Sequence, residues 1–338
     1  MLTALHIDDP AFDDAVWQQY FDLMIEFKNR FGSLLFSRSA EEMKRRTLNR
    51  LRLDGHYFDM VIRDEDRLVG WAVCNVFGPD SPTPFGFIGC DILPDVDPGP
   101  FAVVLARNLA PFFTANRIAD SRIMATNPRT VAVADALGAK RLNRMDSYRL
   151  SRKDANVAVI REWLETYPRR FPPLKLVFFE DVPDRYMDGY IDLYRQFSED
   201  MPRESEELWP FTMTAAEVRK REAQRKANNT HLYICALVDT DDRVVGHTNG
   251  VISADNPRDM YQAMTGIARD YRGRGLSKWL KAALFVKVGE DFPANEYVSS
   301  EMRAVNEPIL AVNRQMGYKL RSQGFECQVV PAMLERFL

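Results

Sequence analysis

The sequence predicts an α+β fold with two domains in tandem, each built on a mixed, mostly antiparallel central sheet flanked by helices. Three observations lead to this prediction. The chain has 338 residues, which is more than one typical domain holds. Short motifs recur in the same order in both halves of the chain. Each half also shows the same succession of strand-like and helix-like hydrophobic patterns.

The internal repeat rests on pairs of matching segments. In chain order, these pairs are His6–Pro10 with Phe179–Pro183, Tyr20–Phe27 with Tyr190–Phe197, Asp66–Gly70 with Asp242–Gly246, and Asn127/Gly138 with Asn306/Gly317. The separation between partners changes only slightly along the chain, as short loop insertions between equivalent elements would produce. Coincidence among common residues is the alternative, and the shared order of the matches makes it the weaker interpretation.

A helical segment followed by prolines marks the boundary between the halves. Apolar spacing predicts a helix over Lys153–Tyr167, which Pro168 is expected to end. A buried strand over Leu174–Phe179 then opens the second half. The expected domains are residues 1–152, a linker helix and Pro-rich turn over 153–173, and residues 174–338.

The second half shows its elements most clearly. Its segments alternate between short apolar runs bounded by turn residues and longer runs with helical spacing. The predicted elements are a hairpin of Leu232–Val238 and Val244–Ser253, a strand Met260–Ala268, a helix Ser277–Val288, a strand Glu296–Ser300, and a helix Pro308–Met316 capped by Gly317. In the first half, a strand over Asp146–Ser151 is the last element.

The composition argues against several classes of partner. A net charge of −3, with no polybasic tract, gives no attraction to nucleic acid or to an anionic membrane. The first ten residues lack the pattern of a secretory signal, and no stretch reaches the ~20 apolar residues that span a bilayer. We therefore expect a cytoplasmic protein. The scattered cysteines and histidines predict buried, reduced thiols and no metal site.

The segment Thr265–Ser277 carries the most specific signal. A strand ends, a loop with Gly273 and Gly275 follows, and a helix begins. Glycines let the main chain approach a phosphate closely, and the free amides at the start of a helix attract anions. Ser277 is predicted to cap the helix, and Arg272 or Arg274 to add positive charge. Neither a P-loop nor the dinucleotide-binding glycine pattern fits this sequence.

These residues resemble a motif of the GNAT superfamily of N-acyltransferases. Arg272-x-x-Gly275 matches the family's Q/R-x-x-G-x-G/A pattern, with Ser277 at the last position in place of Gly or Ala. Gln262-x-x-Thr265-x-Ile267 is similar to the acyl-CoA-binding strand, and the segment from Asn306 through Asn313 to Gly317-Tyr318 is similar to the second motif. The plan with two domains is similar to actinobacterial tandem GNAT proteins such as mycothiol synthase.

The resemblance implies an N-acyltransferase that moves an acyl group from acetyl-CoA or another acyl-CoA to a primary amine of a small molecule. The amine would attack the thioester directly. The residues that would hold the donor are Thr265, Gly266 and Ile267 along the pantetheine, the amides of Arg272, Gly273, Arg274, Gly275, Leu276 and Ser277 at the pyrophosphate, and Asn306 and Asn313 on the opposite side.

The catalytic residues are less clearly marked. Asn313 stands where many GNAT enzymes have a tyrosine that protonates the leaving thiolate, so Tyr318 is the nearby candidate acid. Glu301, expected just after the strand Glu296–Ser300, is the first candidate base, and His247 is the second. A surface carboxylate, a satisfied histidine and a core aromatic residue are the commoner roles of such residues.

The first half lacks the loop. Its equivalent stretch, Ile92–Pro100, has prolines without amide donors, and Asp95 and Asp97 would repel a pyrophosphate. The expected role of this half is structural support and one wall of the acceptor cleft. In the second half, the acidic run Ser198–Glu207, within the expected acceptor region Phe197–Pro210, could attract an amine or be a solvated helix face.

Two other functions fit the same loop. A non-catalytic acyl-CoA-binding module would need no acceptor. An acyltransferase whose donor is an acyl carrier protein would need a basic docking patch, which Arg269, Arg272, Arg274 and Lys278 could form.

Overall fold

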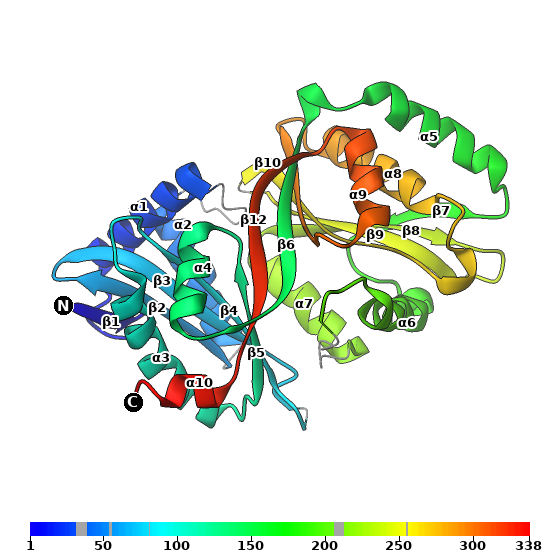
Figure 1. Ribbon diagram of the computed structural model, residues 1–338. Coiled ribbons are helices and arrows are strands. Elements are labelled where there is room, and N and C mark those ends of the chain that lie inside the picture. Colours follow the sequence, from blue (N-terminus) through cyan, green and yellow to red (C-terminus); the bar gives the residue numbers. More distant parts are fainter. Residues whose placement is uncertain (32–38, 54–55, 81, 206–212, 255) are drawn as a thin grey trace. The chain divides into compact units, whose positions relative to one another are not determined.

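The computed structural model describes residues 1–31, 39–53, 56–80, 82–205, 213–254 and 256–338 (Figure 1). The chain forms two compact units. The first contains Met1–Asp146, the described residues of 204–211, and Ser322–Leu338. The second contains Ser147–Arg203 and the described residues from Met213 to Arg321.

The first unit has helices on both faces of a sheet. Its strands run in the order β1-β2-β3-β4-β5-β12, and only the pair β4–β5 is parallel among the pairs whose register is defined. The elements are β1 (Leu2–His6), α1 (Asp14–Phe31), α2 (Ala40–Leu53), β2 (Tyr57–Asp64), β3 (Arg67–Phe77), β4 (Phe85–Ile92), α3 (Pro98–Ala115), β5 (Asp120–Ala125), α4 (Pro128–Ala136) and the start of β6 (Lys140–Ser151).

The second unit has the same succession of elements after an additional helix, α5. Its strands run in the order β7-β8-β9-β10-β11-β6, and β10–β11 is the parallel pair. The elements are α5 (Val157–Arg170), β7 (Lys175–Phe179), α6 (Asp184–Asp200), α7 (Ala215–Ala227), β8 (Thr230–Val238), β9 (Val244–Ser253), β10 (Asn256–Ile267), α8 (Leu276–Asp291), β11 (Tyr297–Arg303), α9 (Glu307–Met316) and the start of β12 (Lys319–Val329).

The repeated topology confirms the predicted fold class. In each unit, a strand and two helices precede three antiparallel strands, and a helix, a parallel strand and a further helix follow. In the second unit, α6 and α7 cover one face of the sheet, whereas α8 and α9 cover the other (Figure 1).

The C-terminal segment completes the first unit rather than the second. The end of β12 pairs antiparallel with β5, from Phe325 opposite Ala125 to Val329 opposite Ser121. The helix that follows, α10 (Pro331–Glu335), packs on α3. The compact units therefore do not follow the halves of the sequence. The limits 1–152, 153–173 and 174–338 describe the sequence repeat, and as domain limits they remain a prediction.

Several predicted limits need correction. The helix before the second half continues through Pro168 to Arg170. A proline in the last turn lacks only one main-chain amide donor, so the helix loses one hydrogen bond there. Its side chains Ile160, Trp163 and Tyr167 are buried in the core of the second unit, so this helix is part of that unit. β6 begins at Lys140, six residues before the predicted strand.

Candidate functional site

The parallel pair of the second unit separates part of the way along. β10 and β11 are paired from Asp259 opposite Tyr297 to Tyr261 opposite Ser299. Both strands continue beyond this point, β10 to Ile267 and β11 to Arg303, and no further pair joins them in the part of the chain that the structure describes. The facing main-chain edges of the two strands are therefore available to a ligand that lies between them.

A bulge in β10 marks the place where the strands separate. Gln262 lies opposite Gly250 and Thr265 opposite Thr248, so β10 has one extra residue there. Side chains of β9 hold the bulge. Asn249 Oδ1 accepts the Met264 amide at 2.8 Å, and Thr248 Oγ1 lies 3.1 Å from the Met264 carbonyl oxygen and 2.7 Å from Thr265 Oγ1.

The glycine loop after β10 has the main-chain conformation that the sequence suggested. Gly273 and Gly275 have φ angles of +74° and +76°, which glycine adopts at little cost. Gly275 is the N-cap residue of α8, so the prediction that Ser277 caps this helix is wrong. Ser277 is already the second residue of the helix because the left-handed turn at Gly275 places Leu276 in helical geometry.

The loop amides point to an anion site. The first amides of a helix have no acceptor within it, and no main-chain acceptor occurs for Gly273, Arg274 and Gly275 among the described residues. A Cβ atom on Gly275 would lie 2.3 Å from Tyr167 Oη, whereas one on Gly273 would meet nothing within 4 Å. Gly273 therefore borders open space, and Gly275 lies against the core.

The arginines of this region are largely paired within the protein. Arg269 binds Glu199 and Asp200, and Arg272 binds Asp200 at 2.9 Å. The hydrogen bond from Arg269, with further help from Arg272, lowers the pKa of Asp200 to about 2. Arg274 donates to the Asp270 carbonyl oxygen. The charges of Arg269 and Arg272 are thus balanced by carboxylates, whereas Arg274 binds only a carbonyl oxygen.

The same ion pairs change the interpretation of the acidic run Ser198–Glu207. Glu199 and Asp200 are bound to arginines, so the part of the run on α6 is not the free acidic surface that would attract an amine. Glu204 belongs to the first unit, where it binds the main-chain amide of Arg144. Residues 206–210 of the expected acceptor region, with Glu206 and Glu207, lie outside the described residues.

A buried polar network lies beneath α8. Gln262 Oε1 accepts hydrogen bonds from Tyr318 Oη, at 2.8 Å, and from Lys281 Nζ, while its amide nitrogen donates to Thr248. Lys281 is 1% exposed, and burial lowers its pKa to about 7. The network links α8 and the chain after α9 to the bulge of β10. The hydroxyl hydrogen of Tyr318, the candidate acid, is directed to Gln262.

Sequence reasoning missed Lys281, although a signal was present. It interrupts the apolar run Trp279–Val286, where a helix that faces a sheet would carry only apolar side chains. A buried charge-bearing residue at such a position needs polar partners on the strand that it faces. Gln262, which the sequence singled out for a different reason, is that partner.

Glu301 and His247, the two candidate bases, lie on the other face of the sheet, toward α6. Glu301 lies within β11, not after it as predicted, because the strand continues to Arg303. Alternation along the strands places its side chain on the same face as Tyr261 and His247. Burial raises the pKa of Glu301 to about 6.

His247 is enclosed by aromatic rings. Its ring centroid lies 4.9 Å from that of Tyr190, 5.5 Å from that of Tyr194 and 6.1 Å from that of Phe197. The side chain is fully buried, and neither ring nitrogen has a hydrogen-bond partner among the described residues. Burial lowers the pKa of His247 to about 3, so the imidazole is neutral at ordinary pH.

The two asparagines of the second motif lie at different places on α9. Asn306 is the N-cap residue, partly exposed, and its side chain makes no capping hydrogen bond. Asn313 is buried, its Nδ2 lies 3.4 Å from Met302 Sδ, and its Oδ1 has no partner among the described residues. Gly317 ends the helix with a φ of +100°, as predicted.

The equivalent region of the first unit is closed by its own side chains. Asp97 caps α3 by accepting the Gly99 amide, and Asp95 binds Arg67. Arg129 donates to the Val96 carbonyl oxygen, within the same loop. Carbonyls and carboxylates thus surround the start of α3, which is the reverse of an anion site.

With both units described, the class of fold is defined: the chain has the tandem GNAT fold, as the resemblance implied. It is similar to a tandem GNAT protein from the clavulanic acid biosynthesis pathway, with 19% identity, a TM-score of 0.70, and coverage of 98% of this chain and 99% of that one. It is also similar to a GCN5-related N-acetyltransferase from Sphaerobacter thermophilus, with 11% identity, a TM-score of 0.63, and coverage of 98% and 95%.

A third similar structure is the glucosamine N-acetyltransferase region of a fungal multi-domain GH3 β-N-acetylglucosaminidase. It has 13% identity and a TM-score of 0.59, and the match covers 97% of this chain and 38% of that one. No protein-family model and no curated protein matches the sequence. In the part of the chain that the structure describes, no helix combines the length and apolar character that crossing a bilayer requires.

Proposed function

We propose that this protein is an acyl-CoA-dependent N-acyltransferase whose active site lies in the second unit. One observation carries the proposal. The left-handed glycine loop Gly273–Gly275 opens α8 directly after a bulged strand that has separated from its parallel neighbour. This arrangement supplies amides for a pyrophosphate and, beside them, strand edges for an extended pantetheine arm.

The proposed donor site uses main-chain groups more than side chains. The amides from Arg272 to Ser277 hold the pyrophosphate, and the edge of Thr265–Ile267 binds the pantetheine. Asn313 offers a buried amide with a free Oδ1 at the side of α9, and Asn306 lies where α9 begins. The role of Arg272 is then to fix the loop to α6 through Asp200.

In the proposed reaction, the neutral amine of the acceptor attacks the thioester carbonyl carbon. A main-chain amide of β10 stabilises the oxyanion, and the carbon–sulfur bond then breaks with departure of the CoA thiolate. Glu301 accepts the proton that the amine loses, directly or through water. A carboxyl group with a pKa near 6 is ionised at neutral pH and still basic enough for this role.

Replacement of Gly273 tests the donor site. Gly273→Val is expected to weaken acetyl-CoA binding more than tenfold, or about 1.4 kcal/mol, because the side chain would project into the open space beside the amides. Gly99→Val at the equivalent loop of the first unit is the matched control and should leave the affinity unchanged. Calorimetry with both folded variants measures the effect, and equal affinities would refute the site.

Replacement of Glu301 tests the base. In the wild-type protein, kcat/KM for CoA release should rise with pH through about 6, as the carboxyl group ionises. Glu301→Gln should lower kcat/KM roughly 100-fold and remove this dependence. Glu296→Gln, which replaces an exposed carboxylate just before the same strand, is the control. A panel of small primary amines serves as acceptors, and a variant with an unchanged pH profile would exclude Glu301.

The ion pairs at the loop reduce the free basic patch that an acyl carrier protein would need as the donor. Arg269 and Arg272 are bound to carboxylates, which leaves Arg274 and Lys278 as the basic residues without a carboxylate partner among the described residues. CoA release with the amine panel also distinguishes the enzyme from a module that only binds acyl-CoA.

A further inference from the structure

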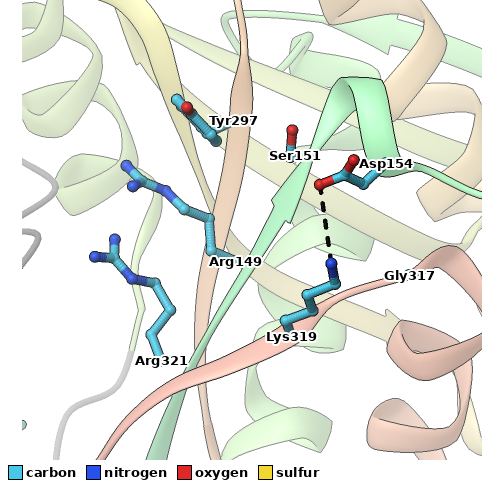
Figure 2. A pocket seen from close by; sticks show the side chains of 7 residues that line it. All are labelled: Arg149, Ser151, Asp154, Tyr297, Gly317, Lys319 and Arg321. Atoms are coloured by element: carbon cyan, nitrogen blue, oxygen red, sulfur yellow. Dashed lines mark ion pairs between the residues drawn. The ribbon is translucent and has the colours of Figure 1, made fainter.

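A depression in the second unit lies away from the glycine loop. It has a volume of about 290 Å³ and opens between the end of β6, the start of β12 and the start of β11 (Figure 2). Basic side chains dominate its wall. The lining residues are Arg149, Ser151, Asp154, Tyr297, Gly317, Lys319 and Arg321.

The charges around this depression do not cancel. Arg149 is bound to Asp259 through contacts of 2.6 and 2.7 Å, and its guanidinium group stacks on the Tyr297 ring at 4.2 Å. Lys319 approaches Asp154 only to 3.9 Å, with both side chains well exposed. Arg321 pairs with no carboxylate among the described residues. The positive charge of Arg321 therefore exceeds the negative charges that pair with Arg149 and Lys319.

The two guanidinium groups lie on the same side of the depression, on neighbouring strands β6 and β12 (Figure 2). Burial and the positive charge of Arg149 lower the pKa of Arg321, while the Asp259 carboxylate and Tyr297 act in the opposite direction. Asp259 is already bound to Arg149, so an anion in the depression would be attracted mainly by Arg321.

Hydrogen-bond donors remain available at the same place. No hydrogen bond of the Ser151 hydroxyl group or of the Arg321 guanidinium group occurs within the described chain. Arg321 is exposed and Ser151 is partly exposed, so both side chains can reach a ligand oxygen.

The depression is separate from the proposed donor site. Tyr297 and Gly317 are at the beginning of β11 and the end of α9, whereas the strand edges proposed for the pantetheine are at the other end of β11. A strand of seven residues spans about 20 Å. A ligand at Arg321 would therefore not touch the glycine loop.

We propose that the depression is a binding site for the phosphate group of a small phosphate monoester. The guanidinium groups lie on one side of the depression and Ser151 lies on another (Figure 2), which suits the outward oxygens of a tetrahedral phosphate better than a planar carboxylate. The volume leaves room for a small organic group next to the phosphate. Arg321 is the principal charge partner, and Ser151 contributes a hydrogen bond.

Calorimetry tests this site with inorganic phosphate and with glycerol 3-phosphate, in chloride buffer at constant ionic strength. Both ligands should bind the wild-type protein, and Arg321→Gln should weaken them at least tenfold. Arg161→Gln, an exposed arginine of α5 outside the depression, should have no effect. Absence of binding to the wild-type protein, or equal binding to Arg321→Gln, would overturn the proposal.

Two further measurements separate this site from the donor site. Gly273→Val should keep the affinity for phosphate, and Arg321→Gln should keep the affinity for acetyl-CoA. If Gly273→Val lost phosphate binding, the phosphate would be at the glycine loop and the second site would be disproved. If Arg321→Gln lost acetyl-CoA binding, the depression would belong to the donor site, contrary to the proposal. If Gly273→Val bound acetyl-CoA as tightly as the wild-type protein, the proposed donor site would be wrong, but phosphate binding that depends on Arg321 would still support the second site.

Discussion

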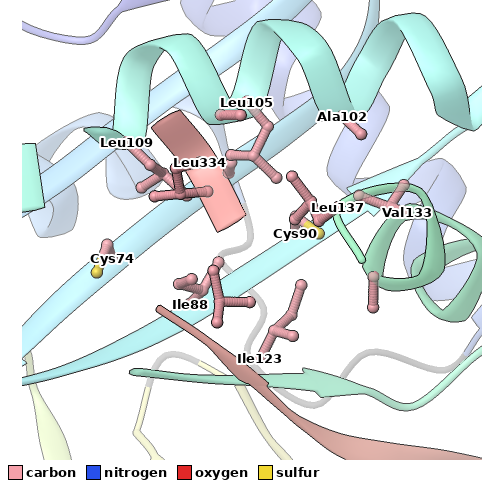
Figure 3. Close-up of a cluster of buried hydrophobic side chains, with 14 of the residues drawn as sticks. Cys74, Ile88, Cys90, Ala102, Leu105, Leu109, Ile123, Val133, Leu137 and Leu334 are labelled. Atoms are coloured by element: carbon pink, nitrogen blue, oxygen red, sulfur yellow. The ribbon is translucent and has the colours of Figure 1, made fainter. Parts of the chain in front are cut away.

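Ending the chain after Arg321 is expected to unfold the first unit, although the deleted residues come from the far end of the sequence. Cys327, Val329 and Leu334 are at most 1% exposed in the core of that unit. Leu334 lies beside Leu105 and Leu109 of α3 (Figure 3). Loss of one such side chain costs about 2–5 kcal/mol, and a whole domain is stable by only about 5–15 kcal/mol.

The deletion also removes one of the two carboxylates beside a buried arginine. Arg122 of β5 is 1% exposed and binds Asp120 at 2.5 Å. It also lies 3.7 Å from Glu326 of β12, which in turn accepts a hydrogen bond from Asn143. Removing one side of a buried ion pair costs about 3–5 kcal/mol, and the remaining pair with Asp120 reduces this cost. Glu326→Gln, which keeps the strand, should therefore destabilise the first unit by a smaller amount than the deletion.

Hydrogen exchange read by mass spectrometry measures both effects. Amides of β2 to β5 should lose protection in the deletion variant, while those of β8 and β9 should change less. Deletion of Leu338 alone, an exposed residue, is the control. Protection of β2 to β5 at the wild-type level after deletion would show that the first unit does not need the C-terminal strand.

Lys281→Met should increase stability, and the increase should shrink as the pH rises. The pKa of Lys281 is lowered to about 7 in the folded protein from 10.5 in the unfolded chain. Between these values, the unfolded chain binds more protons than the folded protein, so the stability of the wild-type protein rises with pH. Below pH 7, the cost of burying the charge is fully present, and above 10.5 it is absent.

The measurable quantity is the difference in unfolding free energy between Lys281→Met and the wild-type protein. It should fall by about 1.4 kcal/mol per pH unit from pH 7.5 to 9.5, as urea unfolding of the second unit would show. Lys287→Met on the same helix, where the lysine is half-exposed and paired with Asp291, should give no such fall. A constant difference for Lys281→Met would mean that the lysine is charged when buried.

The sequence predicted the fold and the loop because both have local signals. Hydrophobic periodicity and turn residues identified the strands and helices, and the glycines identified the left-handed turn before α8. The cap assignment failed at Ser277 because two rules competed, and the conformational freedom of Gly275 outweighed the preference for a hydroxyl cap.

Other features depend on contacts between distant segments. Nothing within Phe325–Val329 shows that it pairs with β5, because strand patterns specify a buried face and not a neighbour. The pairing of Arg269 and Arg272 with α6 is equally invisible, since a basic loop has the same sequence whether its charges are free or bound. The apolar run around Lys281 indicates that this lysine is buried, but the sequence does not show that Gln262 is its partner.

The position of β12 also bears on how the protein is made. A ribosome releases the chain from its N-terminus, so residues 1–146 emerge long before Ser322–Val329 exist. Until Phe325–Val329 has been synthesised, this edge of β5 has no strand to pair with, and an open edge invites association with other chains. The first unit to be synthesised is thus the last to be completed. A chain that stops before Phe325 cannot complete it, and its β5 edge stays open to strands of other molecules.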